Sequence, residues 1–189
     1  MRAWAGLAAG LLLAACAFWS ERPLFGEEDG ALPFDDGARF IWRENGNDEA
    51  AQEVVYHRAG RRYDVTPSAG GERPMRVMFV DVPETAEEDY IAQVALPSEE
   101  SVRLYAFMWR AEGGYRIIAA PRAFAGGSPG RRMMDRVCVT QRNGECQLGS
   151  RQKLMELYLN AVYPAFVVGD ETPEDFMDQL PIDAGAEEK

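Results

Sequence analysis

Short stretches of alternating apolar and polar residues dominate the middle of this 189-residue chain. Side chains of a strand point alternately to two faces, so this alternation predicts half-buried β-strands. We expect about seven strands, each bounded by Gly, Pro, Asn or Asp. They lie at 38–42, 53–57, 63–65, 75–82, 90–96, 102–109 and 115–119. Because no helical period interrupts the series, the expected fold class is mainly β, an antiparallel meander that forms a small barrel or a curled sheet.

The expected strands at 75–82 and 102–109 differ in how their two faces are covered. The first, MRVMFVDV, is almost continuously apolar, which is typical of a central strand with both faces covered. In the second, three aromatic residues alternate with three aliphatic ones, so Tyr105, Phe107 and Trp109 share one face. Either both faces of this strand are covered, or the aromatic face is an exposed surface.

The C-terminal part of the chain changes to a helical period. Ser150 is typical of an N-cap, and the apolar residues between 154 and 161 fall on one stripe of the helix that follows. Pro164 is expected to end this helix. A second short helix is predicted to start at Thr172, with a proline in its first turn, and to end before Pro181.

The first sixteen residues, MRAWAGLAAGLLLAAC, have the layout of an export signal. Arg2 precedes an uncharged run, 3–12, that is too short to cross a hydrocarbon core of about 30 Å. The run ends in Leu13-Ala14-Ala15-Cys16, which resembles the lipobox of bacterial lipoproteins. The resemblance implies that residues 1–15 are removed and that Cys16 carries a diacylglyceryl group. The alternative is an ordinary secretory signal in which Cys16 is an incidental small residue.

The same resemblance predicts where the protein is located and how the chain is divided. In lipoproteins of two-membrane bacteria an Asp after the cysteine favours the inner membrane, so Ala17 implies the outer membrane, facing the periplasm. The membrane is then a partner through the lipid anchor. After the signal peptide we expect an acylated tether at 16–32, a β-rich globular domain with a C-terminal helix at 33–169, and an acidic tail with a short helix at 170–189.

The remaining cysteines, Cys138 and Cys146, form an even pair in a compartment that is expected to be oxidising. If Asn143 and Gly144 form a tight two-residue turn, Cys138 lies opposite Gly149, and an offset of three residues exceeds the reach of a disulfide. Either the connection is wider, or the two thiols are unpaired. We predict the disulfide because of the compartment.

Arginines gather in one part of this acidic chain, whose net charge is −11. Residues 123–130 are rich in glycine and are predicted to be flexible, and five arginines follow between 131 and 151. Arg131, Arg132 and Arg136 are candidates for a surface that binds an anion or an envelope protein. The alternative is that they neutralise the chain's own carboxylates. The overall negative charge disfavours nucleic acid as a partner.

The sequence contains no recognisable catalytic signature. His57 is the only histidine, so a metal site with several histidines is excluded, and a Ser-His-Asp arrangement would depend on this residue alone. Ser150 lacks the surrounding G-x-S-x-G pattern, and no glycine-rich phosphate loop is present. We therefore expect no cofactor, no metal site and no enzyme activity.

These observations favour a lipid-anchored envelope protein that acts by binding. In the first version it is an interaction or structural module that docks a partner through the aromatic strand or the arginines. The alternative is a lipocalin-like carrier of a small apolar ligand, with Phe40, Trp42 and the aromatic strand lining a cavity of several hundred Å³. A filled barrel with an exposed aromatic patch would favour the first version. An envelope hydrolase is the third possibility and would need His57 in a cleft.

Overall fold

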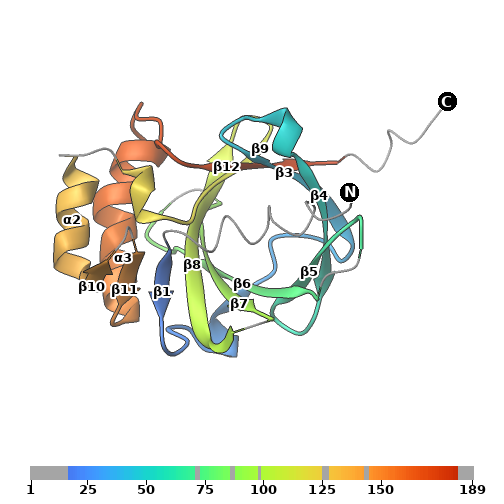
Figure 1. Ribbon diagram of the computed structural model, residues 1–189, viewed down its shortest axis with the longest axis horizontal. Helices are drawn as coiled ribbons and strands as arrows, with labels where there is room; N and C mark the ends of the chain where they lie inside the picture. Colours follow the sequence, from blue (N-terminus) through green and yellow to red (C-terminus); the bar gives the residue numbers. More distant parts are fainter. Residues whose placement is uncertain are drawn as a thin grey trace.

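A closed antiparallel barrel of eight strands forms the centre of the protein (Figure 1). The computed structural model describes residues 17–70, 73–85, 88–97, 99–124, 128–142 and 145–182. The order around the barrel is β8-β7-β6-β5-β4-β3-β12-β9, and β9 pairs again with β8. The bounds are β3 (Ala38–Glu44), β4 (Gln52–Arg58), β5 (Tyr63–Pro67), β6 (Met75–Asp81), β7 (Tyr90–Leu96), β8 (Glu99–Ala111), β9 (Gly114–Ile118) and β12 (Met177–Pro181). The prediction of a mainly β fold is confirmed, and the sheet closes into a barrel.

Strands β3 to β9 follow one another around the barrel, and they correspond to the seven strands expected from the sequence. The prediction that 75–82 is covered on both faces is also confirmed for β6. Val77 and Phe79 point into the barrel, whereas Met78 and Val80 belong to a second core outside it. This arrangement follows from the period of two along a strand.

Strand β12 corrects the prediction of a second helix after Thr172. It pairs with β3 and β9 and so closes the barrel. On its outer face, Asp178 lies between two arginines, with Oδ2 3.4 Å from Nη2 of Arg43 and Oδ1 3.1 Å from Nε of Arg116. These partners come from strands distant in sequence, so tertiary pairing overrides the local helical signal. Residues 177–181 therefore belong to the barrel, not to an acidic tail; residues 183–189 lie outside the described part of the chain.

Three short strands extend the sheet beyond the barrel: β1 (Phe18–Ser20), β11 (Glu145–Leu148) and β10 (Cys138–Arg142). Strand β1 pairs antiparallel with the first half of β8 and parallel with β11. Strand β2 (Gly30–Ala31) pairs with β6. The expectation of a solvated tether over 16–32 is therefore wrong for its described residues, because Phe18 and Phe25 are buried in the outer core.

Two helical segments pack beside the barrel, α2 (Pro129–Val137) and α3 (Arg151–Leu157), and α3 continues as the π-helix η4 (Tyr158–Val167) (Figure 1). Ser150 caps α3 as predicted, since its hydroxyl accepts a hydrogen bond from the backbone N–H of Lys153. The helical path does not end at Pro164, because wider π-turns relieve the clash that proline causes in an α-helix. Helix α2 was not expected; Ser128 caps it, and part of the segment predicted to be flexible is helical.

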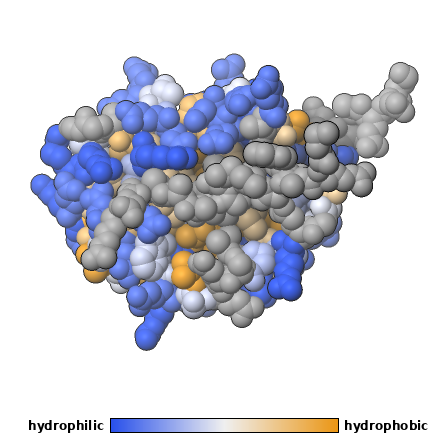
Figure 2. Space-filling model, viewed as in Figure 1, coloured by the Kyte–Doolittle hydropathy of each residue, from blue (hydrophilic) through white to orange (hydrophobic). Residues whose placement is uncertain are grey.

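Among the described residues there are also three single turns of 3₁₀-helix: η1 (Glu27–Asp29), η2 (Asp48–Ala50) and η3 (Pro121–Ala123). No helix in the described part of the chain combines the length and the apolar character needed to cross a bilayer. The face of the molecule seen in Figure 2 is mostly hydrophilic, with small hydrophobic areas near its centre.

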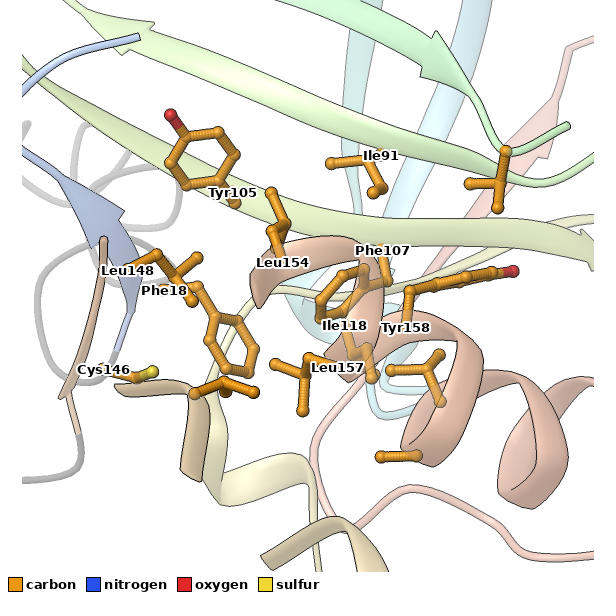
Figure 3. Packing of buried hydrophobic residues seen from close by; sticks show 14 of the residues in the cluster. Phe18, Ile91, Tyr105, Phe107, Ile118, Cys146, Leu148, Leu154, Leu157 and Tyr158 are labelled. Carbon is orange, nitrogen blue, oxygen red and sulfur yellow. The ribbon is translucent and has the colours of Figure 1, made fainter. Parts of the chain in front are cut away.

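The buried residues form two cores that share the wall of the barrel. The inner core fills the barrel and is rich in aromatic residues. The outer core lies between the barrel wall and the helical layer, and Figure 3 shows side chains from β8, β1 and the helices meeting there. Both cores use the same strands, because alternate residues of each strand face opposite sides.

Candidate binding site at one end of the barrel

One end of the barrel is closed by the side chain of Phe34. Its ring lies 4.7 Å from that of Phe40, 5.2 Å from that of Tyr56 and 5.3 Å from that of Phe79, measured between centroids. Its backbone is held as well, because the Phe34 N–H donates to the hydroxyl of Tyr63, and this hydroxyl donates to the Phe34 carbonyl at 2.7 Å. The aromatic cluster leaves this end of the barrel filled.

The opposite end of the barrel contains an apolar cavity of about 80 Å³. Its walls come from the inward positions of the strands, including Trp42 on β3, Val77 on β6 and Ile117 on β9. Space arises because Ala92 on β7 and Ala106 on β8 place only a methyl group where neighbouring strands carry larger side chains. The site can therefore take an apolar group, and it offers few polar partners.

Residues just before β12 form part of the rim of this cavity. In the β3–β4 turn, the Asn45 N–H donates to the Phe176 carbonyl, and the Phe176 N–H donates to Oδ1 of Asn45, both at 2.9 Å. The guanidinium of Arg116 lies 4.4 Å from the centroid of the Phe176 ring. Asp175, which also lines the cavity, pairs with Arg122. These contacts position the rim against the barrel wall.

Two residues that line the cavity donate hydrogen bonds to the same buried oxygen. Trp42 Nε1–H and the Tyr56 hydroxyl lie 3.0 and 2.7 Å from Oε1 of Gln179. Burial raises the pKa of Tyr56 above its ordinary range, so the hydroxyl stays protonated and remains a donor at neutral pH. The network joins β12 to its neighbour β3 and to the next strand, β4, on the inside of the barrel.

The predicted aromatic surface on β8 is not a free surface, and this corrects the sequence interpretation. Tyr105, Phe107 and Trp109 share a face as expected, but they are 1%, 0% and 4% exposed. Figure 3 shows Tyr105 and Phe107 projecting from β8 into the outer core. Phe107 packs at 5.5 Å against Tyr158 of η4. The helical layer covers this face, so these residues neither contact solvent nor line the barrel cavity.

The predicted arginines lie on α2, apart from the barrel cavity. Arg132 and Arg136 are exposed and are four residues apart on one face of the helix, and Arg131 is half-buried. Nothing in the structure tests whether this face binds a partner, and that prediction stays open. Of the five aromatic residues expected to line a carrier's cavity, only Trp42 lines the barrel cavity, and Phe40 packs against Phe34 near the closed end.

The predicted disulfide between Cys138 and Cys146 is confirmed, with Cα atoms 5.2 Å apart. Gln141 pairs with Cys146, which is the register expected for a tight turn. The prediction that this register places the two cysteines beyond the reach of a disulfide is therefore wrong. A bulge between Cys138 and Thr140 shifts the register, and Cys138 is also where α2 ends. The resulting bend brings the two residues within reach.

Other candidate groups lie elsewhere. His57 is exposed on β4, with Nδ1 4.0 Å from Oδ1 of Asp36. Within the described ranges, no group of three or more His, Cys, Asp or Glu side chains is placed to hold a metal ion. Cys16 lies outside the described residues, so its lipidation stays a prediction.

The comparisons with known proteins leave the chain without an assigned relative. No family model matches it, no curated protein matches it, and no solved structure matches it.

Proposed function

We propose that the protein is a non-catalytic binding module of the cell envelope, anchored through Cys16, and that the open end of its barrel takes an apolar group. The observation that carries the proposal is the difference between the two barrel ends. Phe34 fills one end, whereas small side chains leave an apolar cavity at the other. A closed β-barrel with an apolar mouth is also the frame of a lipocalin-like binder.

The volume of the cavity defines the size of the apolar group. Pockets that enclose a drug-sized ligand measure about 300 to 1,000 Å³, and an apolar cavity of about 150 Å³ binds benzene. The barrel cavity, at about 80 Å³, is smaller than both, so it holds less than one benzene molecule. We therefore propose that it receives the end of an alkyl chain or one apolar side chain of a partner, while the rest of the ligand stays outside the barrel.

The proposal is tested by filling the cavity from its own wall. Ala106→Leu adds a branched side chain at a wall position, and Ala111→Leu makes the same change near the tip of the β8–β9 hairpin, at the closed end. Binding of hexanol and octanol is measured by calorimetry. We expect the parent and Ala111→Leu to bind both alcohols and Ala106→Leu to lose about tenfold in affinity. Equal affinity in all three proteins would contradict the proposal.

The membrane anchor is tested separately. If a thioether-linked lipid on Cys16 holds the protein at the envelope, Cys16→Ser moves it from the membrane fraction to the soluble fraction. Ala17→Ser keeps the cysteine and is the matched control. A Cys16→Ser protein that still sediments with membranes, as the parent does, would contradict the anchor.

A further inference from the structure

A second and larger hollow lies on the outside of the barrel. Its volume is about 410 Å³, and it lies between the outer faces of β6 and β7 and residues 23–27, which we call the strap. Met78 and Ala95 form part of its apolar floor, and Leu24 contributes from the strap. The alternation along β6 and β7 separates it from the barrel cavity, because the two hollows use opposite faces of the same strands.

The strap is held over the sheet by two buried side chains, Gln93 and Tyr105, whose hydroxyl accepts a hydrogen bond from the Leu24 N–H at 3.0 Å. Gln93, which is 8% exposed, accepts hydrogen bonds at Oε1 from the N–H groups of Leu24 and Phe25 at 3.0 and 3.2 Å. Its Nε2 donates to the Phe25 carbonyl at 3.2 Å. The Tyr105 hydroxyl contacts the same Oε1 at 3.1 Å. This outer hollow, which we call the groove, is therefore shaped by a specific network of hydrogen bonds and not by loose packing.

Positive charge is concentrated in this groove. Arg62, Arg76 and Arg103 line it, and Glu27 is the one carboxylate among its described lining residues. This contrasts with the whole chain, whose net charge is −11. Three guanidinium groups facing a common hollow raise the local potential and attract an anion from solution.

One of these arginines has a buried N–H donor without a hydrogen-bond acceptor. Nε of Arg62 is buried and makes no hydrogen bond within the described structure. Buried donors in folded proteins nearly always have a partner, because a buried donor without an acceptor destabilises the folded state. Because this atom is shielded from the groove as well as from solvent, a ligand would be attracted by the charge of Arg62 and not by this donor.

We infer that this groove binds a phosphate group that belongs to a larger, partly apolar molecule. A phosphate offers several acceptor oxygens and up to two negative charges, which suits three guanidinium groups better than a single carboxylate does. The volume exceeds what an isolated ion needs and falls in the range of small-molecule sites. The apolar floor beside the arginines accommodates the carbon part of the ligand. This inference does not depend on the function proposed for the barrel cavity.

The test measures binding of three probes to the full-length protein by calorimetry: dihexanoyl phosphatidic acid, inorganic phosphate and neutral dihexanoylglycerol. We expect the phosphatidic acid to bind, and Arg62→Gln to weaken it about tenfold. Arg131→Gln removes the same charge from α2 and is expected to have no effect. Ala106→Leu, which fills the barrel cavity, is also expected to leave this binding unchanged, so the two sites are distinguished.

Two further variants make the result independent of one substitution. Arg76→Gln changes an exposed side chain at the same groove and is expected to weaken binding, and the melting temperature of the variant is measured beside it. Glu27→Gln removes the opposing carboxylate and is expected to strengthen binding. Changes in opposite directions at one groove are not expected from a general loss of stability.

The probes also identify the source of the phosphate. Binding of phosphatidic acid much tighter than that of inorganic phosphate assigns the groove to a lipid headgroup or a similar ester. Equal affinities with the same response to Arg62→Gln assign it to free phosphate. Equal binding of the neutral glyceride, no binding of either phosphate probe, or equal weakening by Arg62→Gln and Arg131→Gln would overturn the inference.

Discussion

Phe34 shows how a single side chain decides which end of the barrel is filled. It contacts one ring from each of five strands, namely those of Phe40, Tyr56, Tyr63, Phe79 and Tyr115. Nothing in its own sequence context, between Pro33 and Asp35, marks it as a core residue. Its role could not be predicted, because it depends on the strands that surround it after folding.

We predict that Phe34→Ala lowers the free energy of unfolding by about 3 to 5 kcal/mol, because the removed ring leaves a cavity in a packed aromatic cluster. The measurement is urea unfolding followed by circular dichroism. Phe34→Leu keeps most of the volume and is expected to cost less than half as much. A loss below about 1 kcal/mol for the alanine variant would contradict the structural role given to this ring.

The buried tyrosines predict an alkaline limit to stability. Burial raises the pKa of Tyr56 and of Tyr158 above the ordinary range, and the nearby Asp89 carboxylate raises that of Tyr158 further. In the unfolded chain both ionise near pH 10, whereas in the folded chain they keep their protons. The unfolded state therefore binds fewer protons above about pH 10, and stability falls as the pH rises beyond it.

This fall amounts to about 1.4 kcal/mol per pH unit for each tyrosine. It is measured as the free energy of unfolding in urea at a series of alkaline pH values, beside the tyrosinate absorbance of the folded protein. Tyr56→Phe removes one ionising group, so the free energy of unfolding is expected to fall less steeply with pH, by about 1.4 kcal/mol per pH unit. The prediction is wrong if all tyrosines of the folded protein ionise together near pH 10.

At the scale of elements, the strands were readable because each carries its own alternation, and α3 because Ser150 and the apolar stripe are local signals. Strand β12 was misread as a helix, because Thr172-Pro173 is typical of a helix start and Phe176, Met177 and Leu180 fall on one helical face. Its identity rests on Arg43 and Arg116, which no local pattern links to it. Helix α2 was missed because the glycine-rich stretch before it outweighed the cap at Ser128.

The disulfide links two of these outer elements, since Cys138 ends α2 and Cys146 lies in β11. Closing a loop of about nine residues is worth about 2.5 kcal/mol in the chain-entropy estimate. We predict that replacing both cysteines by serine lowers stability by about that amount and speeds hydrogen exchange in α2 more than in β6. Exchange that increases equally in α2 and β6 would show that the disulfide does not act locally.

On the scale of the whole molecule, one barrel wall serves two hollows. Inward residues of β6 and β7, such as Val77 and Ala92, line the barrel cavity, while Met78 and Gln93 on the same strands belong to the outer groove. The sequence predicted the alternation but not which face points inward, so neither hollow could be located beforehand. The residues expected to bind, on the aromatic face of β8, instead join the barrel to its helical layer.

The central claim is that the barrel takes an apolar group at the end opposite Phe34. Methyl NMR of the protein titrated with hexanol tests it most directly, because methyl groups line the cavity. We predict the largest shift changes at Ile117, Val77 and Ala106, with little change at the exposed Val139 and Val168. Largest changes at Val139 and Val168, or none at the cavity methyls, would contradict it.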